Sequence, residues 1–308
     1  MRRDGVRGAF HESLPAVHIA VGALYFARHA IHFPRMKFSL FTTLLGIVGF
    51  AFTASADSAT EMVEATFKVW DPAVTGTCFL VKRDAPDEAI YLVTAAHVFE
   101  GMKADKATLV LRERREDGTF KKREHKLEIK NAGKALWVRH PKDDVAVLRI
   151  TSALPVPAPT VPMNALADEA RLKAAALGVT SQLFVLTYPT SFEANEAGFP
   201  VARQGIIASH PLLPYGKKHT FLADFTAFDG DSGGPVFIPG GDGHPVVIGM
   251  VIAQFRSDEK VKSKYEERSV HYPLGLGDVL HAKYVRETLE EAAKQETPKP
   301  TPEPVPAQ

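Results

Sequence analysis

Short segments of apolar and β-branched residues alternate with charged, glycine and proline residues along most of the chain. Seven of these segments lie between Glu61 and Ile150, at 62–70, 76–83, 89–96, 107–114, 119–130, 134–139 and 144–150. Five more follow, at 181–188, 201–210, 219–228, 234–238 and 244–255. Segments of this length between turn residues are typical of β-strands, and Asp117-Gly118 is a common hairpin turn. The pattern predicts an all-β protein.

Prolines and a helical pattern of apolar residues indicate how the folded part of the chain is divided into domains and a terminal helix. Residues 151–164 contain four prolines, which cannot continue a strand ladder, so this segment is expected to link a domain at 57–150 to one at 165–294. Apolar residues at helical spacing predict a helix at 277–293. Residues 295–308 alternate with proline and are expected to be a disordered tail.

The N-terminal segment predicts export. Lys37 precedes the apolar run 38–53, and Ala54-Ser55-Ala56 offers a cleavage site, so residues 36–56 are expected to be a secretory signal peptide. The alternative is a membrane anchor, for which the run is slightly short. We expect cleavage, no stable membrane anchor, and a periplasmic or extracellular protein. Because signal peptides begin at the initiator methionine, translation is expected to start at Met36, with residues 1–35 an erroneous upstream extension.

Charge and cysteine content exclude several classes of function. The 308 residues carry 37 Lys and Arg against 36 Asp and Glu. Residues 1–56 hold six basic and two acidic groups, which leaves 31 basic against 34 acidic groups in the remainder. Nucleic acid is therefore not an expected partner. Cys78 is alone, and the histidines show no metal-binding spacing, so neither a metal nor a cofactor is expected.

Three short motifs bring candidate chemistry: Thr94-Ala95-Ala96-His97, Asp144-Val145-Ala146-Val147-Leu148 and Asp229-Gly230-Asp231-Ser232-Gly233-Gly234-Pro235. Taken singly, each has an ordinary explanation as a structural histidine, a turn aspartate or a loop. Taken together, they supply the histidine, acid and serine that nucleophilic acyl transfer needs. Asp143, beside Asp144, is a second candidate for the acid.

The residue types suit that chemistry. A serine hydroxyl is a poor nucleophile near neutral pH unless an imidazole takes its proton, and a carboxylate behind the imidazole fixes its tautomer. Glycines around Ser232 permit a sharp turn, which would let the N–H groups of Gly230 and Ser232 converge on one developing oxyanion. Ser209 and Ser257 are less suitable nucleophiles, because neither lies in a glycine-framed turn.

These motifs and their order resemble the trypsin/chymotrypsin-fold serine proteases, especially the bacterial members without disulfides. The intervals of 47 residues from His97 to Asp144 and 88 from Asp144 to Ser232 are similar to that family's layout. The resemblance implies two six-stranded antiparallel β-barrels, with a C-terminal helix and the active site between the barrels. It also implies a polypeptide substrate and favours Asp144 over Asp143, because the family's acid directly precedes an apolar-Ala-apolar strand.

Departures from the family pattern concern activation and specificity. No Ile-Val-Gly-Gly sequence lies near the expected mature start, so Asp231 lacks the N-terminal amine that pairs with the equivalent acid in digestive members. The resemblance assigns the substrate pocket to Thr226, Ile252, Ala253 and Gln254. Because Thr226 is no carboxylate, a strict preference for Arg or Lys is not expected, and a neutral, small-to-medium side chain is.

The sequence thus predicts a secreted serine endopeptidase that hydrolyses peptide bonds through His97, Asp144 and Ser232 and an acyl-enzyme intermediate. Two alternatives remain open: a latent or catalytically silent binding protein on the same fold, and a narrow self-processing protease. The sequence predicts no oligomeric state.

Overall fold

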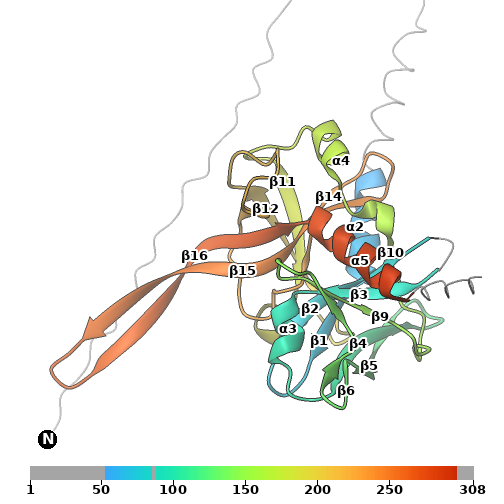
Figure 1. The fold of residues 1–308 in the computed structure, drawn as a ribbon, viewed down its shortest axis with the longest axis horizontal. Coiled ribbons are helices and arrows are strands. Elements are labelled where there is room, and N and C mark those ends of the chain that lie inside the picture. Colours follow the sequence, from blue (N-terminus) through green and yellow to red (C-terminus); the bar gives the residue numbers. More distant parts are fainter. Residues whose placement is uncertain (1–52, 85–87, 297–308) are drawn as a thin grey trace, which may run out of the picture. The chain divides into compact units, whose positions relative to one another are not determined.

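The computed structural model describes residues 53–84 and 88–296. In Figure 1 these residues form two β-rich halves, with a helix at the start and another at the end of the described part packed against them. The predicted extension 1–35, nearly all of the predicted signal peptide and most of the predicted tail lie outside the described residues. Among the helices that are described, none is long and apolar enough to cross a membrane.

In the described residues, the N-terminal half forms an eight-stranded sheet with the order β5-β4-β1-β2-β3-β9-β8, to which β10 adds in parallel beside β2. Its main strands are β1 (Thr66–Trp70), β2 (Thr75–Lys82), β3 (Ile90–Thr94), β4 (Lys106–Arg114), β5 (Phe120–Glu128), β8 (Val138–Arg139), β9 (Ala146–Arg149) and β10 (Val161–Pro162). A separate pair is formed by β6 (Lys130–Asn131) and β7 (Lys134–Ala135). The short helix α3 (Ala96–Gly101) follows β3.

The C-terminal half closes into a barrel of six strands within the described part of the chain, in the order β11-β12-β13-β16-β15-β14. The strands are β11 (Gln182–Thr187), β12 (Val201–Ile207), β13 (Thr220–Asp224), β14 (Pro235–Pro239), β15 (Pro245–Lys262) and β16 (Glu267–His281). Short helical segments precede or interrupt them: η1 (Met163–Ala165), α4 (Glu169–Ala174) and η2 (Pro189–Ser191). The all-β fold with a C-terminal helix is thus confirmed, as is the six-stranded barrel of the second half. In the described residues the first half has eight strands, one of them parallel, where six antiparallel strands were expected.

A continuous apolar core joins the two halves. Phe67, Phe79 and Leu92 of the first half belong to the same buried cluster as Phe237 and Met250 of the second. The last helix, α5 (Ala282–Glu296), contacts β8 and β9 of the first half and β15 and β16 of the second. Its Val285 and Leu289 are buried in that shared cluster, so the helix fastens both halves together.

The structure corrects several predicted boundaries. Residues 62–64 belong to helix α2 (Thr53–Glu64), since Ser58, Met62 and Ala65 are buried at helical spacing, and the first strand begins only at Thr66. The predicted helix at 277–293 begins at Ala282, because residues 276–280 pair with β13. The proline-rich segment also contributes β10 to the N-terminal sheet, where Val161 pairs with Val81.

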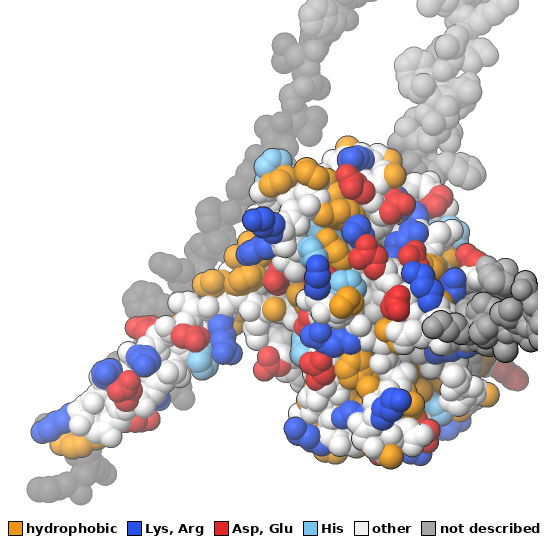
Figure 2. Space-filling model, viewed as in Figure 1, with side chains coloured by type: hydrophobic (Ala, Val, Ile, Leu, Met, Phe, Trp, Pro, Cys, Tyr) orange, Lys and Arg blue, Asp and Glu red, His pale blue; other side chains and the backbone are white. Residues whose placement is uncertain are grey.

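The hairpin of β15 and β16 extends far beyond the barrel, which the sequence pattern did not predict. Figure 1 shows the two strands leaving the body as a ribbon, and Figure 2 shows charges of both signs over its surface. The ladder continues from Gln254↔Gly277 to Lys262↔Glu267. We refer to residues 255–274 as the ribbon.

Candidate active site

His97 lies at the point where a buried strand ends and a short helix begins. β3 stops at Thr94, Ala95 and Ala96 are buried, and His97 stands in the first turn of α3 with its side chain half-exposed. Val98 and Phe99 are buried on the other face of the helix. The apolar neighbours thus anchor the turn and leave the imidazole at the surface.

Asp144 is brought to His97 by strand pairing. Thr94 pairs with Ala146, so the residues just beyond β3 and just before β9 meet at one edge of the sheet. Oδ2 of Asp144 lies 2.5 Å from Nδ1 of His97, and Oδ1 accepts the His97 backbone N–H at 3.0 Å. A carboxylate only accepts hydrogen bonds, so Nδ1 carries the proton and Nε2 is left free to act as a base.

The pair shifts the acidity of both groups. The hydrogen bond to Asp144 raises the pKa of His97 above its ordinary value, against the opposing effect of burial. Burial acts to raise the pKa of Asp144, but the hydrogen bonds and charge of His97 outweigh it, and this pKa lies below its ordinary value. The ionised carboxylate therefore favours an imidazolium when one forms.

Asp143 has a different partner and faces the other half of the molecule. Its two carboxylate oxygens lie 2.8 and 2.9 Å from Nδ1 of His219, in the segment before β13. The ring of His219 is stacked on Tyr284 of α5, with 4.0 Å between the ring centroids. Of the two neighbouring acids, Asp144 is the one that contacts His97, and Asp143 bridges the halves.

Ser232 lies in a glycine-framed turn between β13 and β14. Gly230 and Gly233 have φ angles of 92° and 89°, in the left-handed region that favours glycine. A Cβ built on Gly233 would overlap the carbonyl oxygen of Thr77 and the hydroxyl of Thr94. The serine turn is therefore packed directly against Thr94, the last residue of β3, which lies three residues before His97.

Among residues 230–234, the N–H groups of Gly230 and Ser232 have no acceptor within the described part of the chain, whereas the other three are hydrogen-bonded. The neighbouring carbonyl groups are engaged: Thr77 donates its hydroxyl to Gly230 at 2.8 Å and its N–H to Ser232 at 2.9 Å. The N–H of Thr190 bonds the carbonyl of Asp229 at 2.6 Å. Because these carbonyl oxygens already accept hydrogen bonds, the turn is held in place. The N–H groups of Gly230 and Ser232 are free to donate to an oxyanion.

Asp231, directly before the serine, has an internal partner. It is almost fully buried, and its Oδ2 accepts from Nη2 of Arg203 at 2.6 Å and from the N–H of Phe228 at 2.7 Å. Burial raises the pKa of Asp231 in spite of the guanidinium. Arg203, on β12, is thus the cation that pairs with the acid next to Ser232.

Comparison with known families agrees with this arrangement of motifs. Residues 76–250, more than half of the chain, match the model of the trypsin-like peptidase domain. The chain belongs to the trypsin-like peptidase family. It is therefore a serine-type peptidase.

Two solved structures similar to this trypsin-like peptidase are inactive forms of Rv3671c. One is the Rv3671c protein of M. tuberculosis with a serine-to-alanine mutation, 19% identical, with a TM-score of 0.46 over 80% of this chain and 94% of that one. The other is the Rv3671c protease, also 19% identical, with a TM-score of 0.44 over 79% and 95% of the two chains. No curated protein matches the sequence.

The residues assigned to the substrate pocket of this trypsin-like peptidase lie on two neighbouring segments. Thr226 is exposed after β13, and Ile252, Ala253 and Gln254 follow the barrel part of β15. The Gln254 amide donates to Asp229 at 3.2 Å, which connects the two segments. Nη1 of Arg203 donates to the Thr226 carbonyl at 2.6 Å, so the same arginine fixes the serine turn and this segment.

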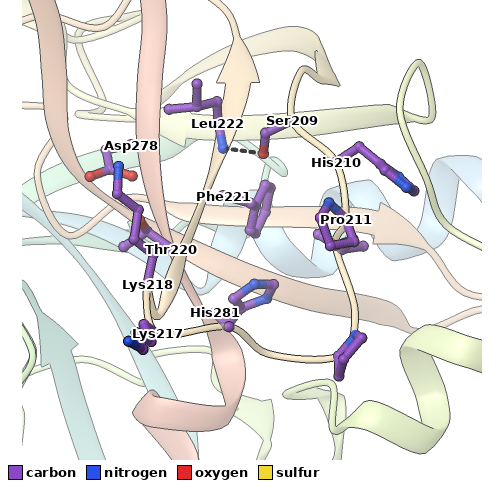
Figure 3. Close-up of a pocket in the computed structure, with 13 residues that line it drawn as sticks. Ser209, His210, Pro211, Lys217, Lys218, Thr220, Phe221, Leu222, Asp278 and His281 are labelled. Atoms are coloured by element: carbon purple, nitrogen blue, oxygen red, sulfur yellow. Dashed lines mark hydrogen bonds between the residues drawn. The ribbon is translucent and has the colours of Figure 1, made fainter.

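The other candidate serines differ from Ser232. The hydroxyl of Ser209 accepts the N–H of Leu222 at 2.9 Å, on the wall of a cavity of about 440 Å³ in the C-terminal half (Figure 3). His281 of that wall is buried, which lowers its pKa to about 4 and keeps it neutral near pH 7. Ser257 lies on the exposed ribbon. In the described residues, the hydroxyl of Ser232 makes no hydrogen bond, and His97 contacts Asp144 but is not hydrogen-bonded to Ser232.

Sequence reasoning missed the residues that support the site. Arg203 and Thr77 lie inside strands, where the sequence pattern gives no sign that they support the site. Their hydrogen-bond partners are distant in the sequence. A polar residue within a strand that is otherwise apolar was the available indication for Thr77. In the part of the chain that is described, no group of three metal-ligating side chains occurs.

Proposed function

We propose that this peptidase is an endopeptidase that cleaves peptide bonds with Ser232 as nucleophile, His97 as base and Asp144 as the orienting acid. The observation that carries the proposal is the double contact of Asp144 with the ring and backbone of His97. That contact fixes the imidazole with Nε2 available, beside a serine turn with two free N–H groups.

The proposed reaction has two stages. Ser232 Oγ attacks the scissile carbonyl carbon while Nε2 of His97 takes the hydroxyl proton, and the oxyanion accepts from the N–H groups of Gly230 and Ser232. The C–N bond then breaks, and His97 gives its proton to the leaving amine, which yields the acyl-enzyme. His97 then takes a proton from water, which attacks the ester carbonyl carbon. The bond between that carbon and Ser232 Oγ breaks, His97 returns the proton to Ser232, and the carboxylic acid product is released.

The direct test is labelling of residues 57–308 with a fluorophosphonate, followed by mass spectrometry to locate the adduct. We expect the adduct on Ser232, no labelling of Ser232→Ala, and unchanged labelling of the matched control Ser209→Ala. No labelling of a folded wild-type protein would contradict an assembled site and favour a latent or silent binding protein. Labelling without cleavage of general protein substrates would favour a narrow, self-processing enzyme.

For specificity, we propose a neutral, small-to-medium side chain before the scissile bond. Thr226 brings no charge to the expected pocket, and Gln254, bonded to Asp229, brings bulk to its entrance. Profiling with a peptide library tests this. Cleavage restricted to sites after Arg or Lys would contradict it.

We also propose that the protein is exported and cleaved after Ala56. Support comes from the basic start, the apolar run 38–53 and the small residues at 54–56. N-terminal sequencing of protein recovered outside the cytoplasm is expected to begin at Asp57. A chain recovered only from the cytoplasm, with residues 36–56 intact, would contradict export.

A further inference from the structure

The ribbon continues the strand that leads away from the serine turn. β14 pairs with β15 as far as Pro235↔Met250. One residue further, Val251 donates its N–H to Gly234 at 2.9 Å and accepts the N–H of Gly233 at 2.8 Å. These two glycines directly follow Ser232, so this edge of β15 passes beside the nucleophile.

Beyond Val251 this edge is open. From Ile252 to Lys262, the only strand that pairs with β15 in the described part of the chain is β16, on the opposite edge. At about 3.3 Å per residue, these eleven residues offer roughly 35 Å of unpaired strand edge. The N–H and C=O groups that point outward along this edge have no main-chain partner. An additional strand can pair with such groups and extend the sheet.

The side chains of the ribbon leave that edge accessible. On one face, polar side chains pair across the two strands: Lys262 forms an ion pair with Glu267 at 3.2 Å, and Nδ1 of His271 lies 2.6 Å from Oδ1 of Asp258. On the other face, Val261 and Tyr272 are 39% and 48% exposed, with the pair Glu259↔Val270 between them in the ladder. The ribbon carries five Lys and Arg against four Asp and Glu, so its charges nearly balance and recognition falls mainly to the main chain.

A third strand would also stabilise the ribbon. A two-stranded hairpin with both faces in water is marginally stable by itself. An extended polypeptide segment on the β15 edge would satisfy the open main-chain groups and cover part of the exposed side chains of Val261 and Tyr272. The edge is continuous with the serine turn, so the same segment can carry the bond to be cleaved.

From this continuity we infer that the β15 edge of the ribbon, Phe255–Lys262, is an exosite that binds the extended main chain of an unfolded polypeptide substrate by strand addition. This inference rests on the proposed function and adds the substrate class: long, unstructured segments rather than short peptides or folded loops. Since the ribbon leaves the serine turn in one direction, it contacts only one side of the scissile bond.

The test uses two peptide series that share one cleavage site and extend by about 4, 8 or 12 residues on either its N-terminal or its C-terminal side. We expect kcat/KM to rise about tenfold or more with length on one side only. In a shortened variant, Asn-Gly joins Ser257 directly to Tyr272 in place of residues 258–271. This variant is expected to lose the length dependence and to keep wild-type kcat/KM on the shortest peptide.

Two controls show whether the gain in kcat/KM comes from main-chain pairing on the β15 edge. The variant His271→Gln changes the side-chain contact with Asp258 from β16 without touching the β15 edge, and it is expected to keep the full length dependence. N-methylation of alternate amides in the long peptide is expected to abolish the gain for one set of positions and preserve it for the other. That alternation is specific to strand pairing.

The outcomes distinguish failure of the exosite inference from failure of the proposed peptidase function. If wild type and shortened variant both label at Ser232 and show equal length dependence, or none, the exosite is overturned while the peptidase remains. If the folded wild type does not label at all, the proposed function itself fails. Light scattering that shows a dimer in wild type and a monomer in the shortened variant, without length dependence, would assign the edge to a second copy and overturn the inference.

Discussion

Arg203 and Asp231 form an ion pair of 2.6 Å directly beneath the serine turn. The carboxylate is 1% exposed and the guanidinium 19%, so neither charge is well solvated without the other. The arginine also donates to Thr187 and to the carbonyl of Thr226, each at 2.6 Å. It therefore acts as a positioning residue for the turn that presents Gly230 and Ser232.

Replacing Arg203 with Met is expected to impair both stability and turnover. Removing one partner of a buried ion pair costs about 3–5 kcal/mol, and loss of one oxyanion donor costs about 10²–10³ in rate. Thermal unfolding and kcat/KM are the measurements. In the double variant with Asp231→Asn, no charge is left unpaired, so Tm is expected to recover more than kcat/KM does. Unchanged Tm and kcat/KM in the single variant would show that the pair does not position the turn.

Asp143 and Asp144 are expected to respond differently to the same substitution. Asp144→Asn removes the acceptor that fixes the His97 tautomer, and kcat is expected to fall by about 10⁴. Asp143→Asn weakens the hydrogen bonds to His219, so it is expected to lower Tm while kcat stays within about tenfold of wild type. Equal losses of kcat in the two variants would contradict the assignment of Asp144.

The pH dependence follows from the state of His97. The imidazole must be neutral to act as a base, and its hydrogen bond to Asp144 raises its pKa. We therefore expect kcat/KM to fall as the pH drops through a midpoint above the ordinary histidine value of about 6.5. A profile measured with a neutral peptide tests this, and a rate independent of pH across that range would exclude His97 as the base.

Gly233→Ala is expected to destabilise the protein more than a matched glycine elsewhere. The new methyl group would overlap Thr77 and Thr94 at a φ of 89°, and a decrease in Tm of about 5–15 °C is expected. Gly241→Ala is the control, because a Cβ there meets no heavy atom within 4 Å. Equal effects on Tm would show that the turn does not need its close approach to β3.

The sequence predicted the strands and motifs because their determinants are local. Alternation and turn residues reveal strands, and the glycines around Ser232 reveal a sharp turn. The fold class and the family are confirmed by the structure and by the match over residues 76–250. The catalytic roles of His97, Asp144 and Ser232 stay predictions.

What the sequence did not reveal depends on contacts between distant segments. Arg112 lies in a highly charged run that suggests a solvated hairpin, and β4 and β5 do form that hairpin. The arginine itself is buried, with its guanidinium over the rings of Phe67 and Phe199 and bonded to backbone carbonyls. The ribbon was missed for the opposite reason, because its charged strands show no apolar alternation and pair only with each other.

The contacts of Thr77 bear on when during its own folding the peptidase becomes active. This residue belongs to β2, yet its N–H and hydroxyl donate to Ser232 and Gly230, and its hydroxyl accepts the N–H of Tyr188. The serine turn of the second half is thus shaped by a strand of the first. A chain with only one half folded would lack the assembled turn, so proteolytic activity would emerge only at the last docking step. Such an order of events would protect a newly made chain, and its neighbours, from premature digestion.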